Sequence, residues 1–222
     1  MKRPFLLFLP FLLFVAGAFV ACEEVQEGGK YDNWQLRNEA FIDSIKSKVG
    51  DNIVTSRTGA ENMEIGKLYA IKVETESTSA NPQYVYCKKL WKSDDGAYPL
   101  YTEKVSVFYH GTLITGDRFD GNFEGFGATD RDIPLPLSEP LPLLENPSGS
   151  KWPTVFDSSA EFAVSGSIAG WTWALQYMRA GERWMLYIPW QSAYGSSGSS
   201  TILGYSSLTF DVYLNGIAGT DD

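Results

Sequence analysis

The side chains that usually carry covalent or metal chemistry are scarce in this sequence. There is one histidine, His110, and no Gly-x-Ser-x-Gly segment, so a nucleophile activated by a neighbouring imidazole has little support. We expect no metal centre, because His110 has no second histidine or carboxylate cluster at ligand spacing. The glycine- and serine-rich stretch 195–200 lacks the lysine and the following helix of a phosphate-binding loop. Nucleophilic, metal and phosphate chemistry are therefore unsupported.

Aromatic side chains are abundant by contrast: the chain has 7 Trp, 12 Tyr and 13 Phe. A single aromatic residue is most often an ordinary core residue, so only their joint spacing carries information about a site. Four segments combine aromatic residues with glycine, proline and polar residues. They contain Tyr109 with Phe119 and Asp120; Phe162 with Gly170, Trp171, Met178 and Gly181; Ile188 and Pro189 with Ala193, Tyr194 and Gly195; and residues 208–212 around Phe210.

In their order and spacing, these segments resemble the FKBP-type peptidyl-prolyl cis-trans isomerases, in the bacterial lipoprotein form, over residues 84–217. The resemblance implies an enzyme that rotates Xaa-Pro peptide bonds in exported proteins by desolvation in an aromatic pocket, without cofactor or metal. Proline-containing segments of exported proteins would be its partners. The alternative is an FKBP-fold binding module or chaperone with weak or no isomerase activity.

The resemblance also implies a role for particular residues. Trp171 would lie beneath the proline ring, Tyr194 and the backbone N–H of Ile168 would bind substrate carbonyls, and Asp120 would lie near the twisting carbonyl. The implied catalytic residues are Tyr109, Asp120 and Tyr194. The implied substrate-binding residues are Phe119, Phe162, Ile168, Trp171, Ile202 and Phe210.

The sequence departs from the family's pattern at three places. Ser167 stands where an aliphatic residue is usual, which predicts a wetter pocket. Residues 201–205 replace the usual Ile-Pro-Pro, although Ile202 is retained. A second Phe-Asp pair, Phe156 and Asp157, resembles the family's Phe-Asp-Ser-Ser, whereas the spacing from Tyr109 favours Phe119 and Asp120; we prefer the latter pair.

The elements that must position these residues are mainly strands. Period-two patterns from Tyr84 onward predict strands at 105–113, 161–165, 183–189 and 207–214, with a helix at 171–178. This order predicts an α+β fold, in which an antiparallel β-sheet wraps on a short α-helix. His110 follows Tyr109 in its strand and points to the opposite face, so we expect it to be exposed. Cys87 is expected to be a small core residue.

A long proline-rich insertion at about 121–160 interrupts the predicted domain. Its Leu-Pro alternation around 133–144 forbids a helix and favours an extended conformation. Asp120 and Phe162 flank the insertion, and both are implied pocket residues. The insertion is therefore expected either to arch beside the pocket and regulate access or to be a solvated spacer.

The N-terminal region predicts export. Lys2 and Arg3 precede an apolar run that ends in small residues before Cys22, which resembles a bacterial lipoprotein signal. Residues 1–21 are the expected signal peptide, Cys22 the lipid attachment site, and the bacterial outer membrane the expected location, on its periplasmic or cell-surface side. A signal peptide cut elsewhere and an uncleaved anchor are the alternatives.

Residues 22–83 are expected to form a tether and an extension with one amphipathic helix, in which Leu36, Ala40, Phe41 and Ile45 share a stripe. The net charge of -9 argues against nucleic acid as a partner. A glycan- or nutrient-binding lipoprotein is a third possibility, because exposed Trp and Tyr stack on sugars. The ordered segments argue against it, since they account for many of the aromatic residues.

Overall fold

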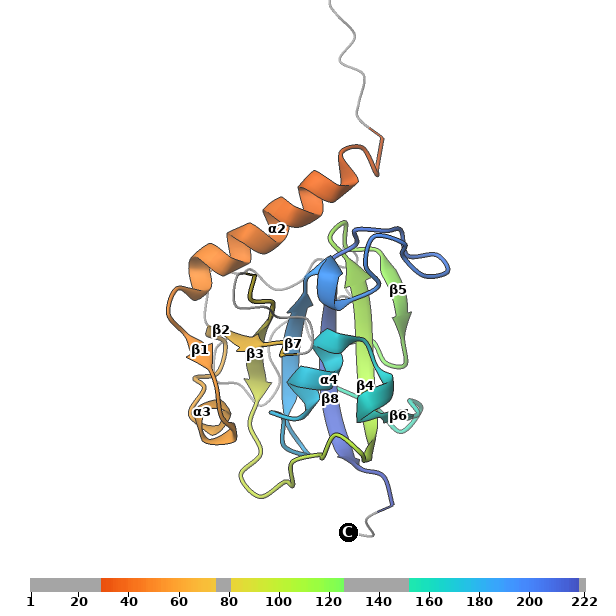
Figure 1. Ribbon diagram of the computed structural model, residues 1–222. Coiled ribbons are helices and arrows are strands. Elements are labelled where there is room, and N and C mark those ends of the chain that lie inside the picture. The colour runs from red at the N-terminus through yellow and green to blue at the C-terminus, as the bar shows by residue number, and fades with distance from the viewer. Residues whose placement is uncertain (1–28, 75–80, 126–151, 220–222) are drawn as a thin grey trace, which may run out of the picture. The chain divides into compact units, whose positions relative to one another are not determined.

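The computed structural model describes residues 29–74, 81–125 and 152–219 (Figure 1). From Asn33 onward these residues belong to one compact unit. The predicted signal peptide, Cys22 and the Leu-Pro stretch of the insertion lie outside the described residues. In the part of the chain that the structure describes, no helix has the length and apolar character needed to cross a bilayer.

Eight strands of the described residues form one sheet in the order β1-β2-β3-β7-β8-β4-β5. The remaining strand, β6, pairs with residues 104–107 of β4, whereas β5 pairs with residues 110–112 of the same strand. All neighbours are antiparallel except β1 and β2. The strands are β1 (Ile53–Val54), β2 (Leu68–Lys72), β3 (Tyr84–Trp91), β4 (Lys104–Leu113), β5 (Arg118–Gly121), β6 (Ala160–Ala163), β7 (Arg183–Ile188) and β8 (Leu208–Ile217).

Helix α4 (Ala169–Leu175) covers one face of the sheet, which we call the α4 face (Figure 1). The main core lies between them and contains Trp171, Leu175 and Leu186. Gly170 permits this packing, because a Cβ at that position would lie 2.5 Å from Cγ2 of Ile188 on β7. The glycine before Trp171 therefore sets the distance between helix and sheet.

Helix α2 (Trp34–Val49) packs on the opposite face, called the α2 face, through Ile42, Ile45 and Val49, whereas Trp34 at its start belongs to the main core. Its buried residues recur every three or four positions, which places them on one side of the helix. Gly50 ends the helix with a positive φ of 56°. The buried residues of α2 are Trp34, Asn38, Ile42, Ile45 and Val49. A shorter helix, α3 (Arg57–Glu61), follows β1, and two 3-10 turns, η1 (Val164–Gly166) and η2 (Trp190–Ser192), flank α4 and β7.

The predicted α+β fold is confirmed, and the elements expected from residue 84 onward are present. The sheet begins earlier than that boundary, however, because β1 and β2 pair upstream of β3. The expected stripe on α2 was partly wrong: Leu36 is 66% exposed, and Asn38 occupies a buried position. Cys87 is buried as expected.

The expectation that His110 is exposed was wrong. It does point to the face opposite Tyr109, but its exposed fraction is only 2%. Phe123 and Gly125 cover it: the His110 Nδ1 lies 3.3 Å from the Phe123 carbonyl oxygen. Alternation along a strand gives the face of a residue, whereas the covering of that face depends on the rest of the chain.

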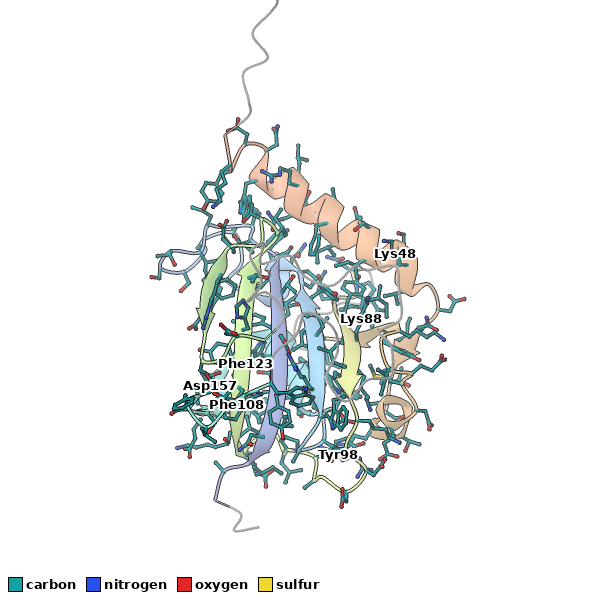
Figure 2. The ribbon with its side chains drawn as sticks, turned by 180° about the vertical axis from the view of Figure 1, so that it is seen from behind. Lys48, Lys88, Tyr98, Phe108, Phe123 and Asp157 are labelled. Carbon is teal, nitrogen blue, oxygen red and sulfur yellow. The ribbon has the colours of Figure 1, made fainter. Side chains whose placement is uncertain are left out.

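The described ends of the insertion pack on the α2 face. Phe123 contacts Phe108 on β4, as Figure 2 shows from behind, with ring centroids 6.3 Å apart. Trp152 contacts Tyr213 on β8, with ring centroids 5.4 Å apart. Asp120 and Phe162, which flank the insertion, line the cavity described below, as expected, whereas Phe123 and Trp152 lead from there to the other side of the sheet.

Candidate functional site

A cavity of 210 Å³ opens on the α4 face, between α4, β4, β5 and the turn that precedes α4. This volume is below that of pockets for drug-sized ligands and fits a single side chain with its flanking backbone. Its lining is mainly aromatic and includes one acidic residue, Asp120. The lining residues are Tyr109, Phe119, Asp120, Phe162, Gly166, Ser167, Ile168, Trp171, Tyr194 and Phe210.

Trp171 lies at the centre of the aromatic packing. Its ring makes edge contacts with the rings of Tyr109, Phe162 and Phe210 at centroid distances of 5.4, 5.6 and 5.1 Å. The side chain is 4% exposed, and within the described residues its buried indole nitrogen has no hydrogen-bond partner. Edge-to-face contacts on several sides fix the ring orientation, so Trp171 presents a rigid apolar surface.

Gly111 makes room for the second aromatic pair, Phe119 and Phe210. A Cβ on Gly111 would lie 2.7 Å from Phe119 and 2.8 Å from Phe210. The two rings meet edge to face at a centroid distance of 5.4 Å. This close approach requires a residue without a side chain on β4, which explains the glycine two positions after Tyr109.

Tyr109 and Asp120 form a hydrogen-bonded pair at the cavity. The Tyr109 hydroxyl donates to Oδ2 of Asp120 at 2.9 Å, and the Gly121 N–H donates to Oδ1 at 2.8 Å. Burial, and then the hydrogen bond to Asp120, raise the pKa of Tyr109 well above its ordinary value. The hydroxyl is therefore a stable donor, and Asp120 is held in one orientation by two donors.

Two further donors face the cavity region and are unused within the described residues. The Tyr194 hydroxyl makes no hydrogen bond there, and Tyr194 is 39% exposed. The backbone N–H of Ile168, the residue before α4, also has no protein acceptor among these residues. Hydroxyl and backbone N–H groups of this kind can donate hydrogen bonds to a carbonyl group.

Most of the residues implied by the sequence come together in this cavity, and one does not. Ile202 is absent from the lining and lies buried with 8% exposed. Of the two Phe-Asp pairs, Phe119 and Asp120 line the cavity, whereas Phe156 is 94% exposed. Cys22 lies outside the described residues.

Gly166 was not among the residues predicted for the site, although it lines the cavity together with Ser167. Gly166 is the last residue of the tight turn η1, and Ser167 directly follows it, between β6 and α4. The small residues between the strand and the helix were the available signal for a turn beside the cavity. Within the described residues, no group of three or more His, Cys, Asp or Glu side chains is suited to hold a metal ion.

A comparison with known protein families finds a match over the C-terminal part of the chain. Residues 149–215 match the family model described as FKBP-type peptidyl-prolyl cis-trans isomerase. The resemblance inferred from the sequence is therefore confirmed for this part of the chain.

Two curated proteins show how far the similarity extends. The chain is 31% identical over 156 residues to the FKBP-type 22 kDa peptidyl-prolyl cis-trans isomerase of Escherichia coli, covering 70% of this chain and 59% of that protein. It is 52% identical over 68 residues to the macrophage infectivity potentiator of Trypanosoma cruzi, covering 28% of this chain and 35% of that one. The chain thus spans between about a third and three fifths of the length of these relatives.

Among solved structures, a peptidyl-prolyl cis-trans isomerase from Pseudomonas syringae pv. tomato is similar at 21% identity and a TM-score of 0.44. That comparison covers 81% of this chain and 95% of the other.

Proposed function

We propose that the chain is a peptidyl-prolyl cis-trans isomerase and that the aromatic cavity on the α4 face is its substrate site. The observation that carries the proposal is the convergence of Trp171, the Tyr109–Asp120 pair and two unused donors on one cavity. The similarity to FKBP-type isomerases over 70% of the chain supports the same activity.

The chemistry needs no nucleophile. The barrier to rotation about a peptide bond, about 18–20 kcal/mol, comes from amide resonance, which places negative charge on the carbonyl oxygen. Water stabilises this planar, polar state, and the twisted transition state has lost the resonance. An aromatic cavity that excludes water from the planar amide therefore favours twisting.

In this proposal each group has a separate task. Trp171 packs beneath the proline ring, while Phe162 and Phe210 exclude water from its sides. The Tyr194 hydroxyl and the Ile168 N–H bind the carbonyls on either side of the rotating bond. Asp120, held by Tyr109, lies beside the carbonyl that turns.

The direct test is exchange between cis and trans forms of an Xaa-Pro peptide, measured by NMR with and without protein. Tyr194→Phe removes one hydrogen bond and should lower the exchange rate by less than about tenfold. Tyr101→Phe is the matched control, because Tyr101 is 51% exposed and does not line the cavity. Absence of catalysis by the wild-type protein on any proline peptide would reject the proposal.

The second candidate is an FKBP-fold binding module with weak catalysis. Ser167 favours it, because this residue lines the cavity where the family usually has an aliphatic residue, and a polar wall admits water. Tight binding of proline peptides without rate enhancement would support this candidate, and Ser167→Val would then increase catalysis.

We also propose that the chain is exported and anchored by a lipid on Cys22 to the outer membrane, where it acts on exported proteins. The support is the charged start, the apolar run and the small residues before Cys22. Metabolic labelling with a fatty acid should be lost in Cys22→Ala. Unchanged labelling of that variant would reject the anchor, and protease treatment of intact cells would distinguish the two faces of the membrane.

A further inference from the structure

Helix α2 is hydrogen-bonded to the segment that carries Tyr194. The Trp34 indole N–H donates to the Ser206 hydroxyl oxygen at 3.0 Å, and the Ser207 backbone N–H donates to Oδ1 of Asn38 at 2.7 Å. Trp34 and Asn38 lie one helical turn apart on the buried side of α2. The contact thus joins residues about 170 positions apart in the sequence.

Asn38 is the polar member of an otherwise apolar stripe. Its side chain is fully buried, and its Nδ2 donates to the Trp34 carbonyl at 2.8 Å. Both ends of the amide are therefore satisfied, one within α2 and one on the Ser207 backbone. An apolar residue would pack at this position without the cost of burying an amide. The amide is therefore explained by its hydrogen bond with the Ser207 backbone, which an apolar residue cannot make.

The segment bound by α2, residues 190–207, is closed by hydrogen bonds between its own residues on both sides of Tyr194. The Tyr205 N–H donates to the Gly195 carbonyl and the Gly195 N–H donates to the Trp190 carbonyl, each at 2.9 Å. The rings of Trp190 and Tyr205 are 4.9 Å apart. The Ser206 hydroxyl, which accepts from Trp34, also donates to the Leu203 carbonyl at 2.7 Å.

This closed segment, residues 190–207, contains backbone conformations that need external support. Tyr205 has a φ of 61° and Ser200 a φ of 50°, both in the left-handed region. Such conformations are costly for residues with a side chain and persist where neighbouring contacts hold them. The contacts of Trp34 and Asn38 fall on the two residues directly after Tyr205.

We infer that α2 sets the position of the Tyr194 hydroxyl at the cavity, and that Asn38 and Trp34 are positioning residues for substrate binding. The inference rests on the proposed function, because it takes the cavity as the substrate site. Loss of the Asn38 contact loosens the Ser207 end of the segment, and the Gly195–Tyr205 pairing transmits this to Tyr194. The N-terminal extension then contributes to substrate binding through the segment that carries Tyr194.

The test compares four variants of the full chain. Asn38→Leu keeps the volume and removes the amide, while Ser206→Ala removes the acceptor of Trp34 with a small change. Leu36→Ala, on the exposed side of α2, is the control for changes in the helix. Ile45→Ala is the control for lost stability, because Ile45 is fully buried and packs in the α2-face cluster that does not contain residues 190–207.

Two measurements are made on each variant: hydrogen exchange of the Gly195 and Tyr205 amides by NMR, and the affinity for a proline peptide. We expect Asn38→Leu and Ser206→Ala to speed exchange of these amides and to weaken peptide binding, each by about fivefold, the equivalent of one buried hydrogen bond. Leu36→Ala should leave both unchanged, and Ile45→Ala should lower stability without weakening the binding of peptide to the folded protein.

The inference is overturned if folded Asn38→Leu and Ser206→Ala exchange and bind peptide as the wild type does, or if Ile45→Ala weakens binding equally. If the wild type binds no proline peptide, the proposed function fails instead. The exchange measurement then still decides whether α2 holds the segment.

Discussion

At the scale of single residues, the cavity depends on pairs of side chains that fix one another. Tyr109 orients Asp120 through a 2.9 Å hydrogen bond, and Trp171 is wedged between Tyr109, Phe162 and Phe210. No side chain of the site is a nucleophile or a base in the proposed mechanism. Single substitutions are therefore expected to have modest effects on rate, in contrast to those in a catalytic triad.

The ionisation of Tyr109 should not limit activity below pH 10. Burial and the hydrogen bond to Asp120 raise its pKa above the ordinary value of 10.0, so the folded protein keeps the hydroxyl protonated through that range. The exchange rate of an Xaa-Pro peptide is measured from pH 7 to 10 with the wild type and with Tyr109→Phe. We expect the wild type to show no decline in rate that is absent from the variant. A decline with a midpoint below pH 10 that is absent from this variant would contradict the assignment.

Gly111→Ala should disturb the cavity walls. The added Cβ would lie within 2.8 Å of both Phe119 and Phe210, so the two rings must move apart. We expect the free energy of unfolding to fall by about 1–3 kcal/mol and peptide affinity to fall with it. Urea unfolding and peptide titration measure the two effects. Gly216→Ala on β8 is the control, because nothing lies within 4 Å of a Cβ there.

At the scale of elements, α2 packs over the α2 face of β3 and buries a lysine beneath it. Lys88 on β3 is fully buried, and Figure 2 labels it together with Lys48 of α2. Burial, and then the charge of Lys48, lower the pKa of Lys88 to about 8. Burial and the nearby charge of Lys48 on α2 therefore destabilise the charged form of Lys88.

Lys88 should make stability depend on alkaline pH. Between pH 8 and 10.5 the unfolded chain binds more protons at Lys88 than the folded chain does, so this residue's contribution to stability rises with pH across that window. Lys88→Met should raise the free energy of unfolding at pH 7 by about 1–3 kcal/mol. The difference from wild type, measured in urea, should shrink toward pH 10. A difference that stays constant from pH 7 to 10 would contradict the shift.

At the scale of the whole compact unit, a buried ion pair connects the extension to the sheet. Lys89 on β3 lies 2.7 Å from Glu182, and both side chains are at most 2% exposed. Lys89 also donates to the Ala60 carbonyl in α3, and Glu182 accepts from the Trp184 indole at 3.0 Å. The pair therefore joins α3, β3 and β7 inside the main core.

Removal of one partner should be much more harmful than loss of a surface pair. Glu182→Gln leaves the Lys89 charge buried without its counter-charge and should lower the free energy of unfolding by about 3–5 kcal/mol. Glu64→Gln, at the exposed pair with Lys67, should change it by less than about 1 kcal/mol. Equal effects of the two substitutions in urea unfolding would show that the buried pair does not stabilise the core.

The extent to which the sequence predicted the site depended on local spacing. Tyr109, Phe162 and Trp171 were inferred from segments with fixed internal spacing, and the structure places them in one cavity. Ile202 was inferred from a loop whose residues depart from the family's pattern, and it lies in the core instead. The buried state of His110 was missed, because Phe123 and Gly125 cover it from a different part of the chain.

The sequence by itself predicted the strand pattern from residue 84, because period-two alternation is a local property. Its resemblance to the FKBP-type family implied most of the cavity residues, because the short motifs that carry the resemblance are local as well. Tertiary structure decided what lies between distant segments. It placed β1 and β2 in the sheet, turned Asn38 of α2 onto the Ser207 backbone, and led Phe123 and Trp152 to the α2 face. These contacts join residues far apart in the chain, and which polar group meets which is set by packing that no local pattern encodes.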